Sequence, residues 1–573
     1  MHTTTARMIR VFVSMFLLLF SFTLLATTKL LDNFSADSYS TYYINNLTAS
    51  VNTTQFSEGS SSLQIQYNLS PSGSGEVFRS YGNYPLDLSF QAQALTLKTY
   101  GTAGAPALKF MLYEDNDMDG NPFESGEDIY EFISATAFSS GSWTTITMDL
   151  NAFSKFGGGT STLNLNRIYA WRILLENQSG SSINGTVYVD DLQFVTNYSI
   201  PSTISNFPNS TFIQLWNDAT CGNCGTWSQA EWEQEFEEMK SLCIDEVVIQ
   251  YGIYNTHSWY SPCTVPGVSS SSNALSNLMA AAQLKNISVY LGLYFDGEFN
   301  ATNAALSSYY LSLWNKNQVV IDELWNLYGN NSSFKGWYIP QEVHDLYWRS
   351  APEQSLLFNW LDQVCDYAKS KSSMHKTIIS PYVGPWMPAD YVQSWYESLF
   401  TTVDQLNEVW LQDGSGTSSN RSLGNSILKD LDVDAPQYIE AIQAACTAKS
   451  RTFAVNVELF SDPAPRNPAA ITRIEDQLKI ASSFSTQLSS FGWMFLDQDL
   501  STSTQQFYSD YSTLRNCSTT ANLTPQVRDA SSDSLVAVFD LIGKTHPTNI
   551  SSLPSGCYIL LYASGNAVKC LVE

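Results

Sequence analysis

The chain has 573 residues and a formal net charge of −26, and 14% of its residues are charged. This length allows several domains. The acidic balance excludes nucleic acid as a partner, because binding phosphates requires a basic surface.

The first 28 residues have the order of a secretory signal peptide. Arg7 and Arg10 precede the apolar residues 11–25, and small residues follow them. This arrangement directs a chain to export, and a retained signal anchor is the alternative. No later run approaches the ~20 apolar residues needed to cross a bilayer. We therefore expect no transmembrane segment after signal removal, and a secreted, extracellular or cell-surface protein.

Residues 29–199 predict a β-sandwich. Short alternating runs are separated by Gly, Ser, Asn and Pro, which is the pattern of short strands joined by turns. These runs are SLQIQYNL, ALTLKTY, LKFMLYED, WTTITMDL, IYAWRILLEN and TVYVDDLQF. The segments LLDNF (30–34) and VYVDDLQF (187–194) resemble the opening and closing strands of jelly-roll carbohydrate-binding modules. The resemblance implies a jelly-roll fold.

The segment EDNDMDG within this region is a candidate calcium loop. Asp115, Asp117 and Asp119 occupy alternate positions before Gly120, and such carboxylates can surround a hard cation with oxygen ligands. An EF-hand would require Glu at the twelfth position, whereas Glu127 comes one residue later. A structural calcium ion and a solvated acidic turn both remain open, and no cofactor is expected for catalysis.

The nine cysteines leave at least one unpaired. Cys221 and Cys224 form a single CGNC motif. A metal site would need a second pair or a histidine cluster at suitable spacing, so a local disulfide or two free thiols are expected. An exported chain meets an oxidising compartment in which disulfides persist.

Residues 205–515 alternate strand-like and helix-like runs and predict a (β/α)8 TIM barrel. Ser228 and Glu231 form a capping box at the start of one amphipathic run. A doubly wound sheet is the alternative, but no βα turn has a Gly-rich phosphate loop. The eight strand-like runs are TFIQLWND (from Thr211), EVVIQYGIY (Glu246), SVYLGLYFDG (Ser288), FKGWYIPQE (Phe334), KTIISPYVG (Lys376), EVWLQDG (Glu408), RTFAVNVELF (Arg451) and GWMFLDQD (Gly492).

Two glutamates end the fourth and seventh predicted strands. Glu342 follows Gln341 in FKGWYIPQEVHD, and Glu458 ends AVNVE. This pattern resembles the clan of retaining (β/α)8 glycoside hydrolases, with Gln in place of the usual Asn before the acid/base. The resemblance implies that Glu342 is the acid/base, with a raised pKa, and that Glu458 is the nucleophile. Retaining enzymes hold these groups about 5 to 5.5 Å apart.

Further strand ends supply aromatic and polar groups that suit a sugar, because sugar rings present apolar CH faces beside hydroxyl groups. Asp413 and Asp497 are rival carboxylates for an inverting mechanism, which uses a wider pair. His344 is expected to be a helper or structural residue. The candidate substrate-binding residues are Trp216, Asn217, Gln250, Tyr251, Tyr254, Gln341, His344, Trp386, Asp413 and Asp497.

A closer resemblance covers most of residues 205–500. The segments FIQLW, WSQAEWEQEFEEMKSLCIDEVVIQY, VYLGLYFDG and GWYIPQE resemble the barrel family catalogued as domain of unknown function 4434. This resemblance supports the barrel and implies a relation to glycoside hydrolases, but it implies no substrate.

Residues 526–573 predict a separate small β domain. The runs VFDLIGK and LPSGCYIL resemble the C-terminal sorting domain of the bacterial type IX secretion system, although Cys557 replaces the usual aliphatic residue. The resemblance implies export and attachment to the cell surface. A β-hairpin packed on the barrel is the alternative.

Together these patterns predict a secreted glycoside hydrolase that acts on a polysaccharide or oligosaccharide. The abundance of aromatic residues, 13% of the chain, is consistent with sugar handling. A non-catalytic carbohydrate-binding surface protein is the alternative. A structural envelope protein would have no aromatic cleft at the barrel mouth.

Overall fold

The computed structural model forms two compact units, Met1–Asn516 and Cys517–Glu573. In the first unit the structure describes residues 27–515 except 35–42, 83, 102–104, 135–136, 139–140, 158–160, 417–421, 424–425, 428–429 and 462–466. In the second unit it describes four strands. The predicted signal peptide lies outside the described residues, apart from Thr27 and Thr28 at the start of the first strand.

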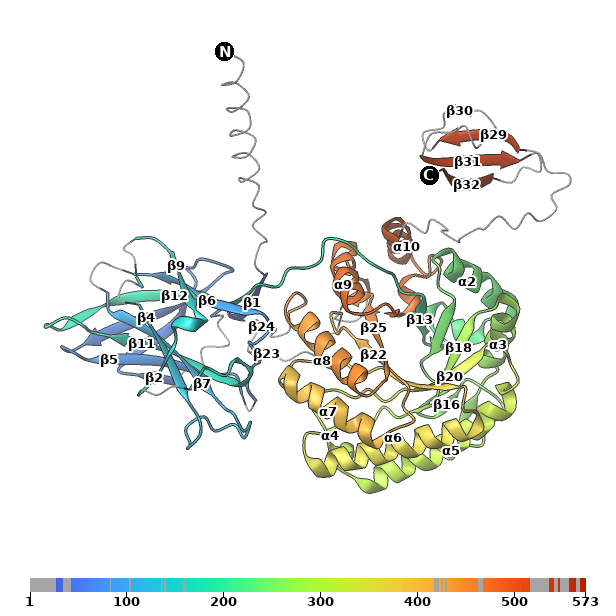
Figure 1. The fold of residues 1–573 in the computed structure, drawn as a ribbon, viewed down its shortest axis with the longest axis horizontal. Helices are drawn as coiled ribbons and strands as arrows, with labels where there is room; N and C mark the ends of the chain where they lie inside the picture. Colours follow the sequence, from blue (N-terminus) through green and yellow to red (C-terminus); the bar gives the residue numbers. More distant parts are fainter. Residues whose placement is uncertain are drawn as a thin grey trace, which may run out of the picture. The chain divides into compact units, whose positions relative to one another are not determined.

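The N-terminal part of the first unit consists of two six-stranded antiparallel sheets, called the sandwich below (Figure 1). One sheet contains β1 (Thr27–Asp32), β3 (Leu47–Asn52), β4 (Ser62–Leu69), β6 (Ala92–Tyr100), β9 (Thr144–Asp149) and β12 (Ile183–Thr196). The other contains β2 (Tyr43–Asn45), β5 (Ser74–Ser80), β7 (Ala107–Glu114), β8 (Ile129–Ser134), β10 (Ser154–Lys155) and β11 (Ile168–Glu176). The strands predicted from the alternating runs are confirmed.

The sandwich follows from period-two patterning of its strands. In β4, Leu63, Ile65, Tyr67 and Leu69 are buried, while the polar residues between them face outward. The two terminal segments pair with each other, because β1 runs antiparallel to β12 with Leu30 opposite Gln193.

The second part is a closed barrel of eight parallel strands, in which β13 pairs with both β14 and β28. The strands are β13 (Ser210–Ile213), β14 (Glu246–Ile249), β18 (Ser288–Gly292), β20 (Phe334–Ile339), β21 (Lys376–Ile379), β22 (Glu408–Gln412), β25 (Thr452–Glu458) and β28 (Leu488–Phe491). Seven connections between consecutive strands carry helices, and α10 follows the last strand. The helices are α2 (Gln229–Ser241), α3 (Ala274–Lys285), α4 (Ala301–Ala304), α5 (Ser307–Tyr328), α6 (Ala351–Lys371), α7 (Ala389–Thr402), α8 (Asp434–Ala448), α9 (Ile471–Phe484) and α10 (Thr502–Arg515).

Helix α2 begins at the predicted capping box. The Ser228 hydroxyl accepts a hydrogen bond from the Glu231 N–H at 3.4 Å, and the Glu231 carboxylate accepts one from the Ser228 N–H at 2.7 Å. These reciprocal bonds satisfy N–H groups that lack partners within the helix. The capping-box prediction is confirmed.

The eighth strand was predicted too far along the chain. The structure places β28 at Leu488–Phe491, and residues Trp493–Phe495 form a 3-10 turn. Ser489 and Ser490 are fully buried in this strand, and the Ser490 hydroxyl bonds the Thr211 hydroxyl at 2.9 Å. Because these buried serines are polar, the strand lacks the apolar pattern that identified the other seven.

Large aromatic side chains fill the barrel interior. The Phe212 ring lies 5.2 Å from Tyr338 and 6.1 Å from Trp410, and Tyr290 lies 5.8 Å from Trp410. This packed interior is a core rather than a pore. The cavity described below is lined by residues at and beyond the strand ends.

Short strands extend the connections. At the carboxyl ends of β14 and β18, β15 and β19 join a four-stranded sheet with β16 and β17. These short strands are β15 (Ile253–Tyr254), β16 (His257–Ser258), β17 (Ser270–Ser271), β19 (Tyr294–Phe295), β23 (Ser422–Leu423), β24 (Ser426–Ile427), β26 (Phe460–Ser461) and β27 (Asn467–Pro468).

The second unit contains a four-stranded antiparallel sheet in the order β30-β29-β31-β32. Its strands are β29 (Leu535–Asp540), β30 (Thr545–His546), β31 (Gly556–Tyr562) and β32 (Ala567–Val572). The runs predicted as a small β unit therefore form strands.

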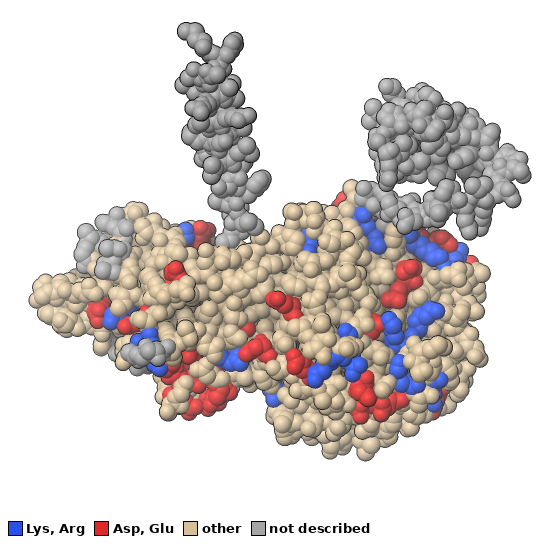
Figure 2. Space-filling view, in the orientation of Figure 1, with Lys and Arg blue, Asp and Glu red and all other residues tan. Residues whose placement is uncertain are grey.

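Most of the surface drawn in Figure 2 is uncharged, and basic side chains on that face are scattered among acidic ones. The face shown carries no broad basic area for a phosphate backbone. Among the described residues, no helix combines the length and the apolar character needed for a membrane span.

Candidate active site at the barrel mouth

A cavity of about 250 Å³ lies at the carboxyl ends of the barrel strands. Its wall comes from the ends of seven barrel strands together with β19 and β26. The lining residues are Gln214, Gln250, Tyr251, Phe295, Glu342, Tyr382, Gln412, Glu458, Phe460 and Phe491. The structure thus brings Glu342 and Glu458, which are 116 positions apart in the chain (458 − 342), into one cavity.

Glu458 is held at the end of β25 with only 2% of its surface exposed. Its Oε2 accepts a hydrogen bond from the Gly416 N–H at 2.7 Å. A bond from an N–H group to a carboxylate favours the ionised form. Gly416 lies beyond β22, so a neighbouring strand end fixes the direction of this carboxylate.

The backbone of Glu458 is fixed by a second group of polar contacts. Asp413 accepts a hydrogen bond from the Glu458 N–H at 3.2 Å and another from the Gln477 amide at 2.5 Å. The Gln477 amide also donates to the Glu458 carbonyl at 3.2 Å. Asp413 therefore lies behind Glu458 and supports it.

Glu342 lies three residues beyond the end of β20 and is half-buried. Tyr251 and Tyr382 line the same cavity, and the charge of Glu342 acts on both of them and on Tyr338. Burial, and next the charge of Glu342, raise the pKa of each of these tyrosines. The charge of Glu458 also contributes at Tyr382, which is therefore near both carboxylates. These phenols stay protonated and can donate hydrogen bonds.

His344 supports Tyr382 from outside the lining. The two rings stack at 4.9 Å with 28° between their planes. Burial, and then the charge of Arg349, lower the pKa of His344 to about 4. The imidazole is therefore neutral at physiological pH, and its Nδ1 accepts a hydrogen bond from the Leu346 N–H at 3.2 Å.

Aromatic side chains form one wall of the cavity and continue outward from it. Tyr251 and Phe295 line the cavity with ring centres 4.8 Å apart. Tyr254 stacks on Phe295 at 5.4 Å, and Trp216 lies 5.0 Å from Tyr254. The predicted aromatic residues of the first two strand ends thus gather on one side.

Of the two predicted glutamines, Gln250 lines the cavity and Gln341 does not. Gln250 lines the cavity, and its Oε1 accepts a hydrogen bond from Gln214. Gln341, by contrast, is 2% exposed and donates its amide to the Tyr294 carbonyl at 2.7 Å. It is not among the lining residues.

Three further predicted residues lie away from the lining. Asn217 is exposed. Trp386 donates its backbone N–H to Asp345 at 2.5 Å. Asp497 borders a separate cavity of about 10 Å³ beside Trp493, together with the Cys221–Cys224 disulfide.

Asp497 shares its surroundings with a buried glutamate. Glu235, on α2, is 7% exposed and accepts a hydrogen bond from the Trp493 indole N–H. Burial, and then the charge of Asp497, raise the pKa of Glu235 from an ordinary 4.5 to about 8. Glu235 is therefore protonated at neutral pH.

Glu235 should make the chain less stable as pH rises. The folded chain binds this proton more tightly than the unfolded chain, so stability is lost between pH 4.5 and about 8. The expected slope approaches about 1.4 kcal/mol per pH unit. Urea unfolding across this range should show a flatter profile for Glu235→Gln. Glu237→Gln, at an exposed position on the same helix, is the control. An equal slope in wild type and Glu235→Gln would contradict the expectation.

Of the two alternatives for the CGNC motif, a local disulfide and two free thiols, the structure has the disulfide. Cys221 and Cys224 are bonded, whereas Cys263, Cys365 and Cys446 are free thiols among the described residues.

Besides Gln412, which ends β22, five other lining residues were absent from the predicted set. Gln214 and Tyr382 follow strand ends and could have been found by counting polar groups beyond each predicted strand. The three phenylalanines gave no such signal, because an apolar residue at a strand end is indistinguishable from core. The residues are Gln214, Phe295, Tyr382, Phe460 and Phe491.

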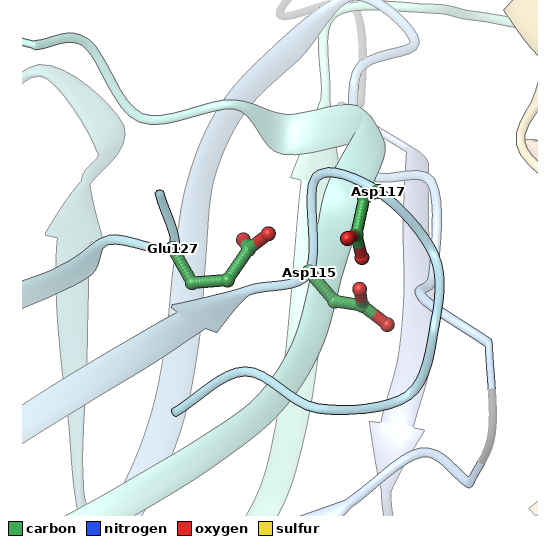
Figure 3. A group of neighbouring side chains, drawn as sticks. All are labelled: Asp115, Asp117 and Glu127. Carbon is green, nitrogen blue, oxygen red and sulfur yellow. The ribbon is translucent and has the colours of Figure 1, made fainter. Parts of the chain in front are cut away.

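The acidic loop of the sandwich forms two overlapping carboxylate groups. Asp115, Asp117 and Glu127 place ligand oxygens within 4.8 Å of one another, and Asp117, Asp119 and Glu124 do the same. Figure 3 shows the first three side chains pointing into one space. Asp119 thus belongs to the second group, and Glu127 joins Asp115 in the first.

Comparisons with known proteins give one family match. The family described as Domain of unknown function (DUF4434) matches residues 209–497. The "Uncharacterized protein YbcH" of Escherichia coli (strain K12) is 26% identical over 234 residues, covering 39% of this chain and 74% of its own length.

The similar solved structures include proteins of carbohydrate metabolism. A Bacteroides thetaiotaomicron protein described as a candidate alpha-L-fucosidase has a TM-score of 0.45 at 20% identity, covering 55% of this chain and 95% of its own. The CBM22-1-GH10 modules of Clostridium thermocellum xylanase 10B have a TM-score of 0.30 at 10% identity, covering 82% and 90%. These scores are too low to assign a function.

Proposed function

Since this chain belongs to the family described as Domain of unknown function (DUF4434), which assigns no reaction, we propose from its site that it is a glycosidase. Its substrate would be a polysaccharide or oligosaccharide, and its mechanism would be retaining. The observation that carries the proposal is the shared cavity of Glu342 and Glu458, bordered by an aromatic wall. The alternation of barrel strands and helices supports a (β/α)8 fold of the kind that carries active sites at its strand ends.

The two glutamates differ in ways that suit different roles. The Gly416 N–H donates to Glu458, and such a donor favours a carboxylate able to attack the anomeric carbon. Glu342 is the proton donor to the glycosidic oxygen, so that this bond breaks as the glycosyl-enzyme bond forms. Glu342 then takes a proton from the water that hydrolyses the intermediate.

The surroundings support binding of a sugar. Tyr251 and Phe295 offer aromatic faces to the CH groups of a sugar ring. Gln250, Gln412 and Tyr382 offer hydrogen-bonding groups to hydroxyls in the same cavity. Asp497 is a poor partner for an inverting reaction, because it borders a different cavity.

The direct test is a panel of aryl glycosides and polysaccharides, with product release and binding both recorded. Release of a sugar with retained anomeric configuration would support the proposal. Binding without release would assign the chain instead to the carbohydrate-binding surface proteins.

We also propose that the sandwich is a jelly-roll carbohydrate-binding-like module and that the chain is exported. The pairing of β1 with β12 supports the first assignment. The C-terminal strands support a small β domain, for which sorting and cell-surface attachment are proposed from sequence resemblance. Detection of the protein in culture medium and surface fractions of its host tests the location.

A calcium ion in the acidic loop is a further part of the proposal. Carboxylate oxygens are the ligands that calcium prefers, and Asp115, Asp117 and Glu127 supply them within 4.8 Å of one another. Burial, and then the charge of Glu127 among its neighbours, raise the pKa of Asp115, although backbone N–H groups oppose this rise. A cation would offset the repulsion between these carboxylates.

Calcium should therefore raise the melting temperature of the wild type. At a concentration 100 times the dissociation constant, binding stabilises the folded state by about 2.7 kcal/mol. Asp117 belongs to both carboxylate groups, so Asp117→Asn should lose most of the shift. Asp149→Asn, at an exposed position in the same sandwich, is the control. A calcium titration that shifts Asp117→Asn as strongly as wild type would contradict this site.

A further inference from the structure

The sandwich contacts the barrel at the loops that carry the candidate active site. Arg167 forms two hydrogen bonds of 3.0 Å with the Asp390 carboxylate, and Lys29 forms a buried ion pair of 2.6 Å with Asp434. Asp390 and Asp434 stand in the first turns of α7 and α8. These helices follow β21 and β22, whose ends supply Tyr382 and Gln412 to the cavity.

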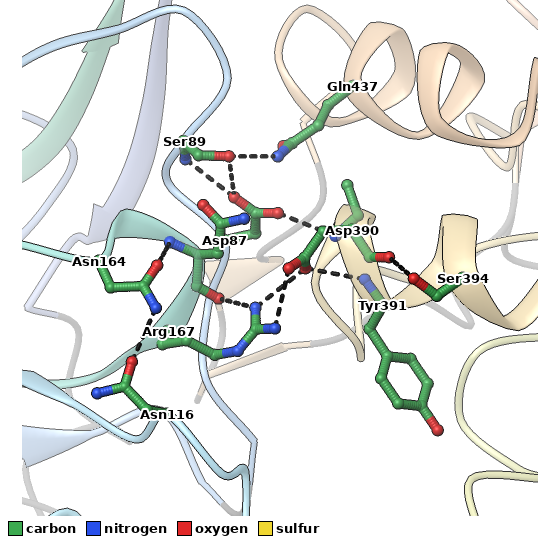
Figure 4. Close-up of polar contacts among 11 residues, drawn as sticks. Asp87, Ser89, Asn116, Asn164, Arg167, Asp390, Tyr391, Ser394 and Gln437 are labelled. Atoms are coloured by element: carbon green, nitrogen blue, oxygen red, sulfur yellow. Dashed lines mark hydrogen bonds and ion pairs between the residues drawn. The ribbon is translucent and has the colours of Figure 1, made fainter. Parts of the chain in front are cut away.

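Asp87 of the sandwich caps helix α7 of the barrel. Its Oδ2 accepts a hydrogen bond from the N–H of Ala389, the first residue of α7, at 2.9 Å. The preceding Pro388 gives no side-chain cap to this helix. The other carboxylate oxygen accepts bonds from the N–H and hydroxyl of Ser89, at 2.9 and 2.6 Å. Figure 4 shows Asp87 held in this position beside Arg167 and Asp390.

The segment before α7 is bonded to the loop that carries Glu342. The Asp345 carboxylate accepts hydrogen bonds from the N–H groups of Gly384, Trp386 and Met387, at 2.9, 2.5 and 3.0 Å. Asp345 is three residues beyond Glu342 in the chain. The segment bonded to Asp345 starts two residues after Tyr382, which lies near both glutamates.

The same loop has a second contact with the sandwich. The Arg349 guanidinium lies 3.6 Å from the centre of the Tyr84 ring. An arginine over an aromatic face is attracted by its electrons. The loop from Glu342 to Arg349 is therefore held through Asp345 on one side and through Tyr84 on the other.

From this continuous set of contacts we propose that the sandwich positions the active-site loops of the barrel, with Asp87 and Tyr84 as its positioning residues. This role is separate from binding a polymer. A tethered binding module would change action on polymers alone, because it raises the local concentration of a large substrate. A module that positions Glu342 and Tyr382 changes action on every substrate, because small displacements of reacting groups slow the reaction. The catalytic part of the inference rests on the proposed function.

Backbone hydrogen exchange of the full chain tests the positioning directly and requires no substrate. Asp87→Ala should speed exchange of the Ala389 amide and of the Gly384, Trp386 and Met387 amides about fivefold, as expected for loss of a helix cap. Tyr84→Ala should speed amide exchange in residues 342–349, and it keeps the Asp87 cap on α7. Asp149→Ala is the matched control, because Asp149 caps a turn within the sandwich itself.

Activity supplies the second readout. Asp87→Ala and Tyr84→Ala should lower kcat by the same factor on a small aryl glycoside and on a polymer. Loss confined to the polymer would overturn the proposal and make the sandwich a tethered module. Unchanged exchange in residues 342–349 and 384–389 in both variants would also overturn it. If wild type hydrolyses nothing, the proposed function fails, whereas faster exchange in the variants still supports the positioning role.

Discussion

Glu342→Gln and Glu458→Gln should each lower kcat on an aryl glycoside by about 1,000-fold or more. General acid-base groups contribute up to about 10,000-fold, and loss of the nucleophile removes the glycosyl-enzyme intermediate altogether. Both changes keep the volume of the side chain and one acceptor oxygen, and they replace the other oxygen by an NH2 donor. Binding of the sugar should therefore persist within a few-fold.

The two variants should also differ from each other in a defined way. A substrate whose leaving group has a low pKa requires little protonation. Such a substrate should restore much of the rate of the first step in Glu342→Gln and none of it in Glu458→Gln. Glu440→Gln, at an exposed position on α8, controls for loss of a negative charge. Full activity in either active-site variant would remove that glutamate from the mechanism.

Gly416→Ala should lower kcat about 100-fold while leaving the fold intact. A Cβ at this position would come within 2.5 Å of the Phe460 carbonyl oxygen and 3.0 Å of Glu458 Oε2. The backbone must move, and the 2.7 Å bond from the Gly416 N–H to Glu458 moves with it. A displacement of about 1 Å near reacting groups costs on the order of 100-fold.

A matched glycine separates this effect from the general cost of replacing glycine. A Cβ at Gly180 meets no atom within 4 Å, so Gly180→Ala should leave kcat unchanged. Far-ultraviolet circular dichroism would check that Gly416→Ala remains folded. Wild-type activity in Gly416→Ala would show that the Gly416 N–H does not position Glu458.

The sequence predicted the barrel well because its strands and helices have different periods. Six of the eight barrel strands lie within the predicted runs, β13 begins one residue before its run, and α2 begins at its predicted cap. The eighth was misplaced because Ser489 and Ser490 are buried in pairing contacts that no local pattern reveals. Strand order then placed Glu342 and Glu458 at one mouth, since parallel strands end on the same side.

The sequence by itself therefore determined the succession of elements, the strand ends and the two glutamates. Only the tertiary structure decided which strand-end groups face one cavity. It directs the Gln341 amide to Tyr294 and places Asp413 behind Glu458. It also brings Asp87 to helix α7, 302 residues away in the chain. The physical reason is that side-chain direction and long-range contacts arise when distant elements pack together, whereas periodicity and capping are local properties of the chain.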